Sequence, residues 1–376
     1  MKRTSIVKVL NACLTLSLLI GIVAVASATH AATIIVNPGD DLKSAVEGAA
    51  PNDVVELRQG IHPVSCAAGT NCITIPSGVT IMADATAPQG TVVVQGGDNS
   101  LRITLFSSTG TDITVSGLKF VPDPSAAMGG RAVWFAQGGG NLVFNDNIVK
   151  QFTDAVFARN QTVGDIQFRN NDVTIVDRDP AANNGFIGGN AALTVLFAEL
   201  DRLNASGNTI HGPGRNVERF VAVTGVIVFN TSQTVGSMDI WNNAIKGFDF
   251  AIFTSGQVGE DGVAIMENRL HSNGVALGVG QVPDPDITIP TPACCTNIVQ
   301  NRITGNDIGI LIAENAEDTN INRNQIAGNR EAPIIDDTGG STTTIGDNLI
   351  RGKNSGYRPP IPPGMAFDPV TGPVGG

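Results

Sequence analysis

The chain has 376 residues and is acidic, with 34 Asp and Glu against 23 Lys and Arg and a net charge of −11. This charge excludes nucleic acid as a partner held by counterion release. It also disfavours any other polyanion unless a local basic patch or a bound cation reduces the repulsion.

Residues 1–31 have the composition of a signal peptide. Lys2, Arg3 and Lys8 precede an apolar run from Val9 to Ala26, and Ala26–Ala28 supplies small residues for cleavage. Removing this segment moves the net charge from −11 to about −14. We therefore expect an exported protein, periplasmic or extracellular. No other stretch is long and apolar enough to cross a membrane.

The mature chain is expected to open with a cap. A β-run at Thr33–Val36 is followed by a turn, an amphipathic helical run at Lys43–Ala49 and a second β-run at Asp53–Leu57. A stack of strands needs such a cap, because an uncovered end would expose core residues and strand edges.

Four cysteines remain after removal of the signal peptide. Cys66 and Cys72 flank five small or polar residues, so we predict that they form a disulfide in an oxidising compartment. Cys294 and Cys295 are adjacent, which leaves open a vicinal bridge, two free thiols or two separate pairings.

One short phrase recurs eight times between Leu142 and Ile350. It reads apolar, any, apolar, two of any type, Asn, any, apolar, and its base period is near 24 residues, with some copies lengthened by loops. The anchoring asparagines are Asn147, Asn171, Asn208, Asn243, Asn268, Asn301, Asn324 and Asn348.

The apolar residues of the phrase alternate, as in a strand, and those five and three positions before each Asn are expected to face inward. So short a strand cannot bury its apolar face alone, so each coil must lie against the next. An Asn buried at each turn can then bond to the Asn of the neighbouring coils, and Asn tolerates the left-handed backbone of a tight turn.

This pattern resembles the pectate-lyase-like superfamily over residues 33–350. The resemblance implies an all-β fold, a right-handed single-stranded parallel β-helix (a solenoid) with Asn-ladder turns and an N-terminal capping helix. The expected organisation is a signal peptide at 1–31, one β-helix domain at 32–350 and a flexible Pro/Gly-rich tail at 351–376. The fold hosts many activities, so it does not by itself fix the function.

Stacking makes columns of residues at one offset in successive coils. An aromatic column is predicted from Trp134, Phe157, Phe197, Phe229 and Phe253. If Val156 and Ile252 face inward, the aromatic residues face outward and form a shelf for sugar faces or a partner. An interior stack is the alternative.

A basic column is predicted three residues after the anchors. It comprises Lys150, His211, Lys246 and His271, with Thr174 as an interruption and Arg351 further along. On an acidic protein, such a column is suited to an acidic sugar. We therefore name His211, Lys246 and His271 as candidate substrate-binding residues. A solvated row of charges is the alternative.

Charged residues also gather in two long loops, at 174–191 and 211–225, that leave consecutive coils after the same turn. Asp177, Asp179 and Glu218 are candidate ligands for Ca²⁺, Arg178 for binding substrate, and Arg215 and Arg219 for catalysis. Such a division of labour is seen in pectate-lyase-like enzymes, where a cation neutralises the uronate carboxylate and an Arg removes the α-proton. Loop salt bridges explain the same residues.

Two functions follow from these patterns. The first is binding or processing of polysaccharide, with acidic (uronate) sugars and β-elimination preferred; no cofactor is required, and Ca²⁺ is the candidate ion. The second is a non-catalytic exported scaffold or adhesin-like binding protein. The chain lacks the Asp-Pro-His motif of alginate epimerases and the motif series of polygalacturonases. A glycosidase needs two carboxylates across a cleft, and the aromatic-bearing strands, with Ala155, Ala251, Ala276 and Gly309 at their outward positions, do not offer them. The expected partner is a polysaccharide or cell-surface glycan.

Overall fold

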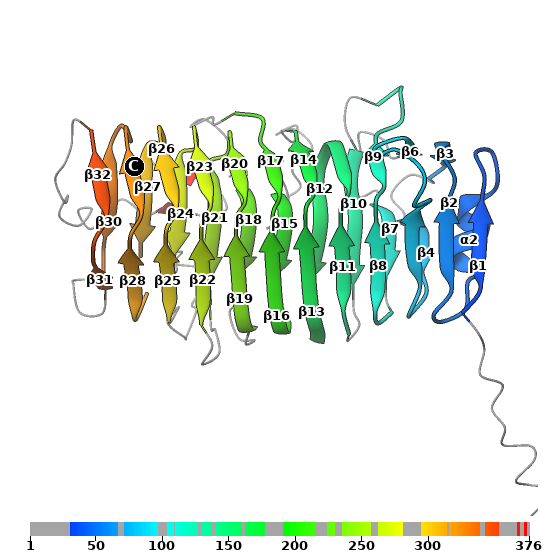
Figure 1. Ribbon diagram of the computed structural model, residues 1–376, viewed down its shortest axis with the longest axis horizontal. Coiled ribbons are helices and arrows are strands. Elements are labelled where there is room, and N and C mark those ends of the chain that lie inside the picture. Colours follow the sequence, from blue (N-terminus) through cyan, green and yellow to red (C-terminus); the bar gives the residue numbers. More distant parts are fainter. Residues whose placement is uncertain are drawn as a thin grey trace, which may run out of the picture. The chain divides into compact units, whose positions relative to one another are not determined.

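The computed structural model of the chain (Figure 1) describes residues 31–66, 71–96, 104–108, 110–126, 129–136, 140–159, 162–176, 191–196, 198–214, 224–229, 235–256, 262–280, 295–313, 316–338, 343–352, 367–368 and 372–373. The chain forms two compact units, Met1–Ala32 and Thr33–Gly376, and the fold below is that of the second. The expected signal peptide lies outside the described residues except for Ala31, so it stays a prediction.

The first row of strands is a twelve-stranded parallel sheet, in which each strand pairs with the equivalent strand of the next coil (Figure 1). Its members are β1 (Thr33–Val36), β2 (Val54–Leu57), β5 (Thr80–Ala83), β8 (Ile113–Ser116), β11 (Leu142–Asn145), β13 (Thr162–Arg169), β16 (Glu199–Ser206), β19 (Val235–Trp241), β22 (Val263–Met266), β25 (Thr296–Val299), β28 (Thr319–Asn322) and β31 (Thr343–Ile345).

The second row follows the first in each coil, and most of its strands are short. Its members are β3 (Gly60–Val64), β6 (Val92–Gly96), β9 (Lys119–Val121), the start of β12 (Ile148–Arg159), β14 (Asp172–Ile175), β17 (Thr209–His211), β20 (Ala244–Lys246), β23 (Arg269–His271), β26 (Arg302–Thr304), β29 (Gln325–Ala327) and β32 (Leu349–Arg351).

The third row completes the coil and joins the second through β12, which takes part in both rows. Its other members are β4 (Asn71–Ile75), β7 (Thr104–Ser108), β10 (Gly129–Ala136), β15 (Ala191–Leu196), β18 (Thr224–Phe229), β21 (Phe250–Ser255), β24 (Val275–Val279), β27 (Ile308–Ile312) and β30 (Ala332–Asp336). These three rows of parallel strands confirm the predicted β-helix.

The core lies between the rows, and the predicted inward positions are confirmed. Leu142, Phe144, Phe168 and Ile240 are fully buried, and the rings of Phe144 and Phe168 stack with centroids 5.7 Å apart. Burial of large apolar side chains from every coil is the main term that stabilises such a stack.

The eight anchoring asparagines form one ladder. In a central rung, the backbone N–H and Nδ2 of Asn268 both donate to Oδ1 of Asn301, at 2.9 and 3.0 Å. The Nδ2 of Asn268 also donates to the carbonyl oxygen of Ile240 at 2.8 Å. The same contacts join Asn243 to Asn268, and Asn268 is completely buried. The predicted inward column is confirmed.

The left-handed residue of the turn is not the ladder Asn but the residue before it. Asp146, Asn170 and Glu267 have φ of 59°, 54° and 57°. Gly117 takes this conformation too, with φ of 72°, and Leu118 then occupies the ladder position and donates its N–H to Oδ1 of Asn147. Gly117 therefore aligns with the residue before the Asn, and Leu118 with the Asn itself.

A second, shorter ladder lies between the second and third rows. The side chains of Asn273, Asn306 and Asn329 are joined in the same way, with Nδ2 to Oδ1 distances of 3.0 and 3.2 Å. The sequence reading missed this ladder, although each member follows a first-ladder Asn by five residues.

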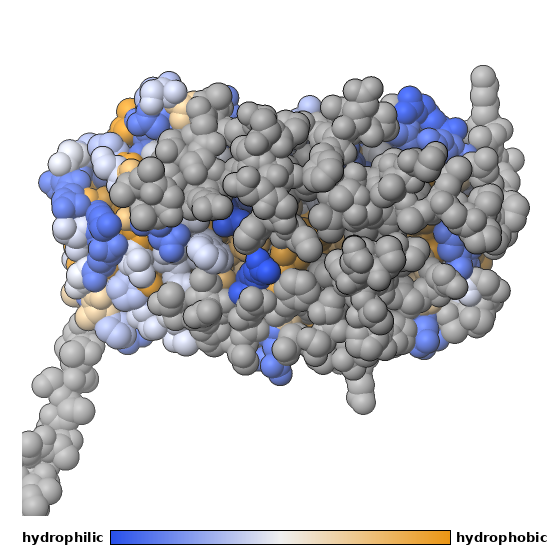
Figure 2. All heavy atoms as spheres, turned by 180° about the vertical axis from the view of Figure 1, so that it is seen from behind, coloured by the Kyte–Doolittle hydropathy of each residue, from blue (hydrophilic) through white to orange (hydrophobic). Residues whose placement is uncertain are grey.

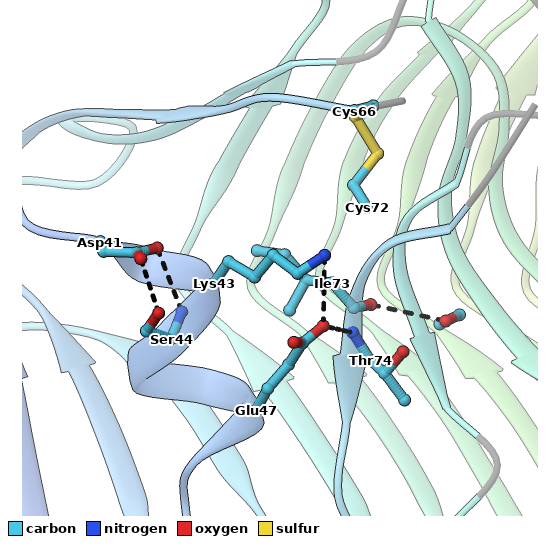
Figure 3. Close-up of polar contacts among 9 residues, drawn as sticks. Asp41, Lys43, Ser44, Glu47, Cys66, Cys72, Ile73 and Thr74 are labelled. Carbon is cyan, nitrogen blue, oxygen red and sulfur yellow. Dashed lines mark hydrogen bonds and ion pairs between the residues drawn. A yellow bond between two sulfur atoms is a disulfide. The ribbon is translucent and has the colours of Figure 1, made fainter. Parts of the chain in front are cut away.

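The N-terminal coil is closed by α2 (Leu42–Glu47), as predicted (Figure 3). Asp41 caps the helix by accepting hydrogen bonds from the N–H and hydroxyl of Ser44, and these bonds lower the pKa of Asp41. Leu42 and Val46 are buried in the core. Glu47 accepts a hydrogen bond of 3.0 Å from the N–H of Thr74, which joins the helix to β4.

The predicted disulfide between Cys66 and Cys72 is present, with Cα atoms 4.7 Å apart (Figure 3). It closes the connection between β3 and β4 beside the capping helix. Cys295 is also disulfide-bonded, with a partner outside the described residues, so the alternative of two free thiols is wrong.

Beyond β32, the described residues of the tail form one antiparallel pair, β33 (Phe367–Asp368) with β34 (Gly372–Pro373), which the sequence did not predict. In the described part of the chain, no helix has the length and apolar character to cross a membrane.

Candidate functional site

The basic column is present in the second row, in the register that the sequence predicted. Lys150 pairs with Thr174, Thr174 with His211, His211 with Lys246, and Lys246 with His271. The residue before each member of the column faces the core, because Val149, Ile210, Ile245 and Leu270 are completely buried. Strand alternation therefore turns the lysines and histidines of the column outward.

A second outward column lies on the same strands, two residues earlier. It brings Arg269 and Arg302 into register with Ala244 and with each other, and both arginines are exposed. Neither arginine was predicted from the sequence, because the predicted column used a single offset from the anchoring asparagines. The sequence nevertheless indicates both arginines, because each directly follows a ladder Asn. The two-residue alternation of a strand then places them on the same face as His271.

The charges of the second row are almost all positive. From β9 to β32 its cations are Lys119, Lys150, Lys246, Arg269, Arg302 and Arg351, and its acid is Asp172. Asp172 is engaged by Lys150, with Nζ 2.8 Å from Oδ2. On a chain of net charge −11, this row is the local basic patch that holding a polyanion requires.

The pKa values of His211 and His271 are lowered by partial burial and by this positive surface. Partial burial, followed by the charge of Lys246, lowers the pKa of His211 below the ordinary value of 6.5, while Asp172 acts in the opposite direction. Partial burial and Lys246 likewise lower the pKa of His271. Both imidazoles are therefore mainly neutral at pH 7, and an anion that screens Lys246 would favour their protonation.

The loop cluster lies outside the described residues. Asp177, Arg178, Asp179, Arg215, Glu218 and Arg219 all fall in the two ranges 177–190 and 215–223. Their roles in catalysis, substrate binding and Ca²⁺ binding stay predictions. Within the described ranges, no group of three or more His, Cys, Asp or Glu side chains is arranged to hold a metal ion.

The aromatic column differs from its prediction in two coils. Trp134 pairs with Phe157, but Phe157 pairs with Thr194, Thr194 with Ile227, and Ile227 with Phe253. Phe229 instead pairs with Leu196 and Ser255, two positions further along the strand, and Phe197 is outside the described residues. The prediction aligned these coils by aromatic character, and varying loop lengths hide the true register.

The column faces away from the main core. Val156 and Ile252 belong to that core, as the outward alternative required, whereas Phe157 and Phe253 belong to a separate apolar cluster. Although they face outward, Phe157 and Phe253 are only 1% and 2% exposed, and Trp134 is half-buried. Figure 2 shows hydrophobic patches of the described part on the face turned away in Figure 1. An open shelf along the whole column is therefore excluded.

An ion pair that the sequence reading missed stands beside the aromatic column. Nε of Arg131 lies 3.8 Å from Oδ2 of Asp154, and the guanidinium carbon lies 4.1 Å from the ring centre of Phe157. Burial lowers the pKa of Arg131, although Asp154 opposes this shift. Asp154 immediately precedes Ala155, so the third row carries a buried carboxylate that the prediction did not include, and Arg131 holds it.

The rows and ladders define the chain as a parallel β-helix protein. No protein-family model matches the chain, and no curated protein matches it. Among solved structures, it is similar to an alginate lyase from Paenibacillus sp., at 14% identity and a TM-score of 0.46, over 85% of this chain and 99% of that one.

Two further structures are similar at the same level. Pectate lyase Pel9A has 14% identity and a TM-score of 0.40, over 87% of this chain and 78% of that one. The A-module of the Azotobacter vinelandii mannuronan C-5 epimerase AlgE4 has 15% identity and a TM-score of 0.36, over 85% and 91%. At these values the similarity concerns the fold, and it carries no argument about what this chain does.

Proposed function

We propose that this chain is an exported β-helix protein that binds acidic polysaccharide, with uronate sugars preferred, on the outward face of its second row. The observation that carries the proposal is the basic column of Lys150, His211, Lys246 and His271, which stands in register on a strongly acidic chain. Because the rest of the molecule repels polyanions, an anionic sugar chain is directed to this face.

Cleavage is the finer part of the proposal, and it depends on the two long loops. Asp177, Asp179 and Glu218 would hold Ca²⁺ against a uronate carboxylate, and the cation would make the α-proton acidic enough to remove. Arg215 and Arg219 would act in proton abstraction, with Arg178 on the substrate. The reaction expected from this set is β-elimination.

A binding-only protein is the second candidate, and one observation favours it. The acid among the second-row strands from β9 to β32 is Asp172, and it is paired with Lys150. That face can hold an anion, but it offers no carboxylate free to act as a general acid or base. If the two long loops catalyse no reaction, the chain is an exported scaffold or adhesin that binds glycans.

The test uses the mature chain with polygalacturonate and alginate, with and without Ca²⁺. Calorimetry measures binding, and ultraviolet absorbance measures unsaturated product. We expect Lys246→Ala to weaken binding about fivefold, the loss of a few exposed contacts. Lys43→Ala, which removes an exposed cation from the capping helix, is the control and should bind like the parent.

The catalytic arm uses Arg215→Ala and Asp177→Ala. If unsaturated product forms with the parent and is lost in both variants, the lyase assignment is supported. If the parent binds but gives no product with Ca²⁺, the chain is the binding-only protein. Failure to bind any uronate polymer, or equal binding by Lys246→Ala and Lys43→Ala, overturns the proposal.

A further inference from the structure

We infer that the second row holds an internal stretch of a linear polyuronate along the axis of the solenoid, across β17, β20, β23 and β26. Each of these four strands supplies at least one cationic or titratable side chain to a sugar carboxylate. The inference rests on the proposed function and deepens it, because it specifies the direction, length and shape of the ligand.

The surface, here called the basic track, consists of His211, Lys246, Arg269, His271 and Arg302. First and third residues of the short strands both face outward, because the middle residues, such as Ile245 and Leu270, are completely buried. The third-position residues His211, Lys246 and His271 are in register, and so are the first-position residues Arg269 and Arg302. Side chains from adjacent strands therefore form two parallel lines along the axis.

The cations of the track lack an internal counter-charge. Within the described part of the chain, Lys246, Arg269 and Arg302 form no ion pair, whereas Lys150 is paired with Asp172 and Arg202 with Asp239. These strands are paired on both sides, so the cations are not protecting an open sheet edge from aggregation. Like charges on adjacent strands repel one another, and an external anion would remove that repulsion.

The two ends of the track are set by particular residues. On one side stands β14, where Asp172 neutralises Lys150. On the other side stands β29, whose outward residues Gln325 and Ala327 are uncharged and separate the track from Arg351. Four strands therefore contribute in succession.

The spacing of the strands fits a sugar chain. Neighbouring parallel strands lie roughly 4.8 Å apart, a distance comparable to the length of one pyranose unit along a linear polymer. A polymer with one carboxylate per unit then presents about one anion to each strand. A short oligomer uses only part of the track, so affinity should grow with length and level off once all four strands are engaged.

The experiment measures the Kd of the mature chain for oligogalacturonates from the disaccharide to the octasaccharide. We expect Kd to fall with each added unit and to level off at the tetra- or pentasaccharide. The double variant Gln325→Lys with Ala327→Lys bridges the neutral gap to Arg351. It should bind the octasaccharide roughly fivefold more tightly, as two exposed ion pairs allow, and the disaccharide like the parent.

The matched control is Thr344→Lys, which adds charge at an exposed first-row position. It should change neither the Kd for the octasaccharide nor the Kd for the disaccharide. If oligouronates bind with the same Kd at every length, or if bridging the gap acts no differently from Thr344→Lys, the track is wrong although the proposed function stands. If no oligouronate binds, both are wrong. Binding of sulfated oligosaccharides in place of uronates would overturn the ligand assignment.

Discussion

The asparagine ladder and the basic column are built by the same repeat, only three residues apart in each coil, yet they behave in opposite ways. A neutral amide carries donors and an acceptor, so stacked asparagines satisfy one another, as Asn243, Asn268 and Asn301 do. A stacked ammonium has donors only, and it opposes protonation of a neighbouring imidazole. Partial burial, followed by the charge of Lys246, lowers the pKa of His211 and His271, and no hydrogen bond joins these three described residues.

This difference separates stability from function. Repetition of a self-complementary residue inside the solenoid stabilises the fold with every coil, whereas like charges placed on neighbouring strands outside it cost free energy. A column that opposes folding needs another reason to be present, and an anionic ligand supplies one. Stability and function can then be tested separately on adjacent positions.

The largest change, a loss of folding stability, is expected from removing an asparagine at the centre of the ladder. Asn268→Ala removes the Nδ2 donor to the buried Oδ1 of Asn301, which keeps only the backbone N–H of residue 268, and it leaves the N–H and Nδ2 of Asn243 without their acceptor. We expect it to lower the free energy of unfolding by about 1–3 kcal/mol, measured by urea denaturation. Asn297→Ala, at an exposed first-row position, is the control and should stay within about 0.5 kcal/mol of the parent.

A smaller effect is expected at the end of the ladder. Asn348 accepts from Asn324, is only partly buried, and donates to the carbonyl oxygens of Gly346 and Ile321, and the described residues include no further rung after it. Water can replace part of what Asn348→Ala removes, so we expect a cost below about 1 kcal/mol. Equal costs at Asn268 and Asn348 would mean that burial within the ladder is not what gives it its strength.

The basic column should respond with the opposite sign. Lys246→Ala relieves repulsion in the free protein, so it should leave the free energy of unfolding unchanged or raise it by up to about 0.5 kcal/mol. Thermal unfolding at low salt measures this, and high salt should erase the gain. A clear loss of stability at low salt would show that Lys246 serves the fold.

The smallest effect is on protonation. Lys246→Ala should raise the pKa of His211 and His271, because a positive neighbour no longer opposes the imidazolium form. In the parent, the folded state binds these protons less tightly than the unfolded chain, so the contribution of the histidines to stability falls as the pH drops below 6.5. Titration of the imidazole resonances by NMR, in parent and variant, tests the direction.

The sequence predicted what depends on strict repetition. The ladder, the inward apolar positions and the basic column all follow from a fixed offset, and the structure confirms each of them. The left-handed residue was placed one position late, because Asn, Asp, Glu, Gln, Arg and Gly all occur there and no single residue type marks it. The second ladder was missed because only three coils carry it.

The third row was predicted less well because its register is not set by a fixed offset. Loops of different length enter β15 and β18, so Thr194 and Ile227 took the places expected for Phe197 and Phe229. The pair of Arg131 and Asp154 was missed because it lies three residues, not two, before the aromatic position. Strict alternation does not predict two outward residues with that spacing.

The first ladder also has a direction. Each rung from Asn147 to Asn324 donates its backbone N–H to the asparagine of the next coil, and each rung from Asn171 to Asn348 receives one from the previous coil. The chain of amides begins at Leu118, which can give its N–H but has no side-chain oxygen to receive one. At the other end, Asn348 donates to the carbonyl oxygens of Gly346 in its own turn and of Ile321 in the coil before it, and no asparagine among the described residues accepts from it. An Asn introduced in a coil after Gly352 could accept the N–H of Asn348, whereas an Asn introduced one coil before Leu118 would find no side-chain oxygen to accept its own N–H. The ladder can therefore be extended toward the C-terminus, but toward the N-terminus only if Leu118 is replaced first.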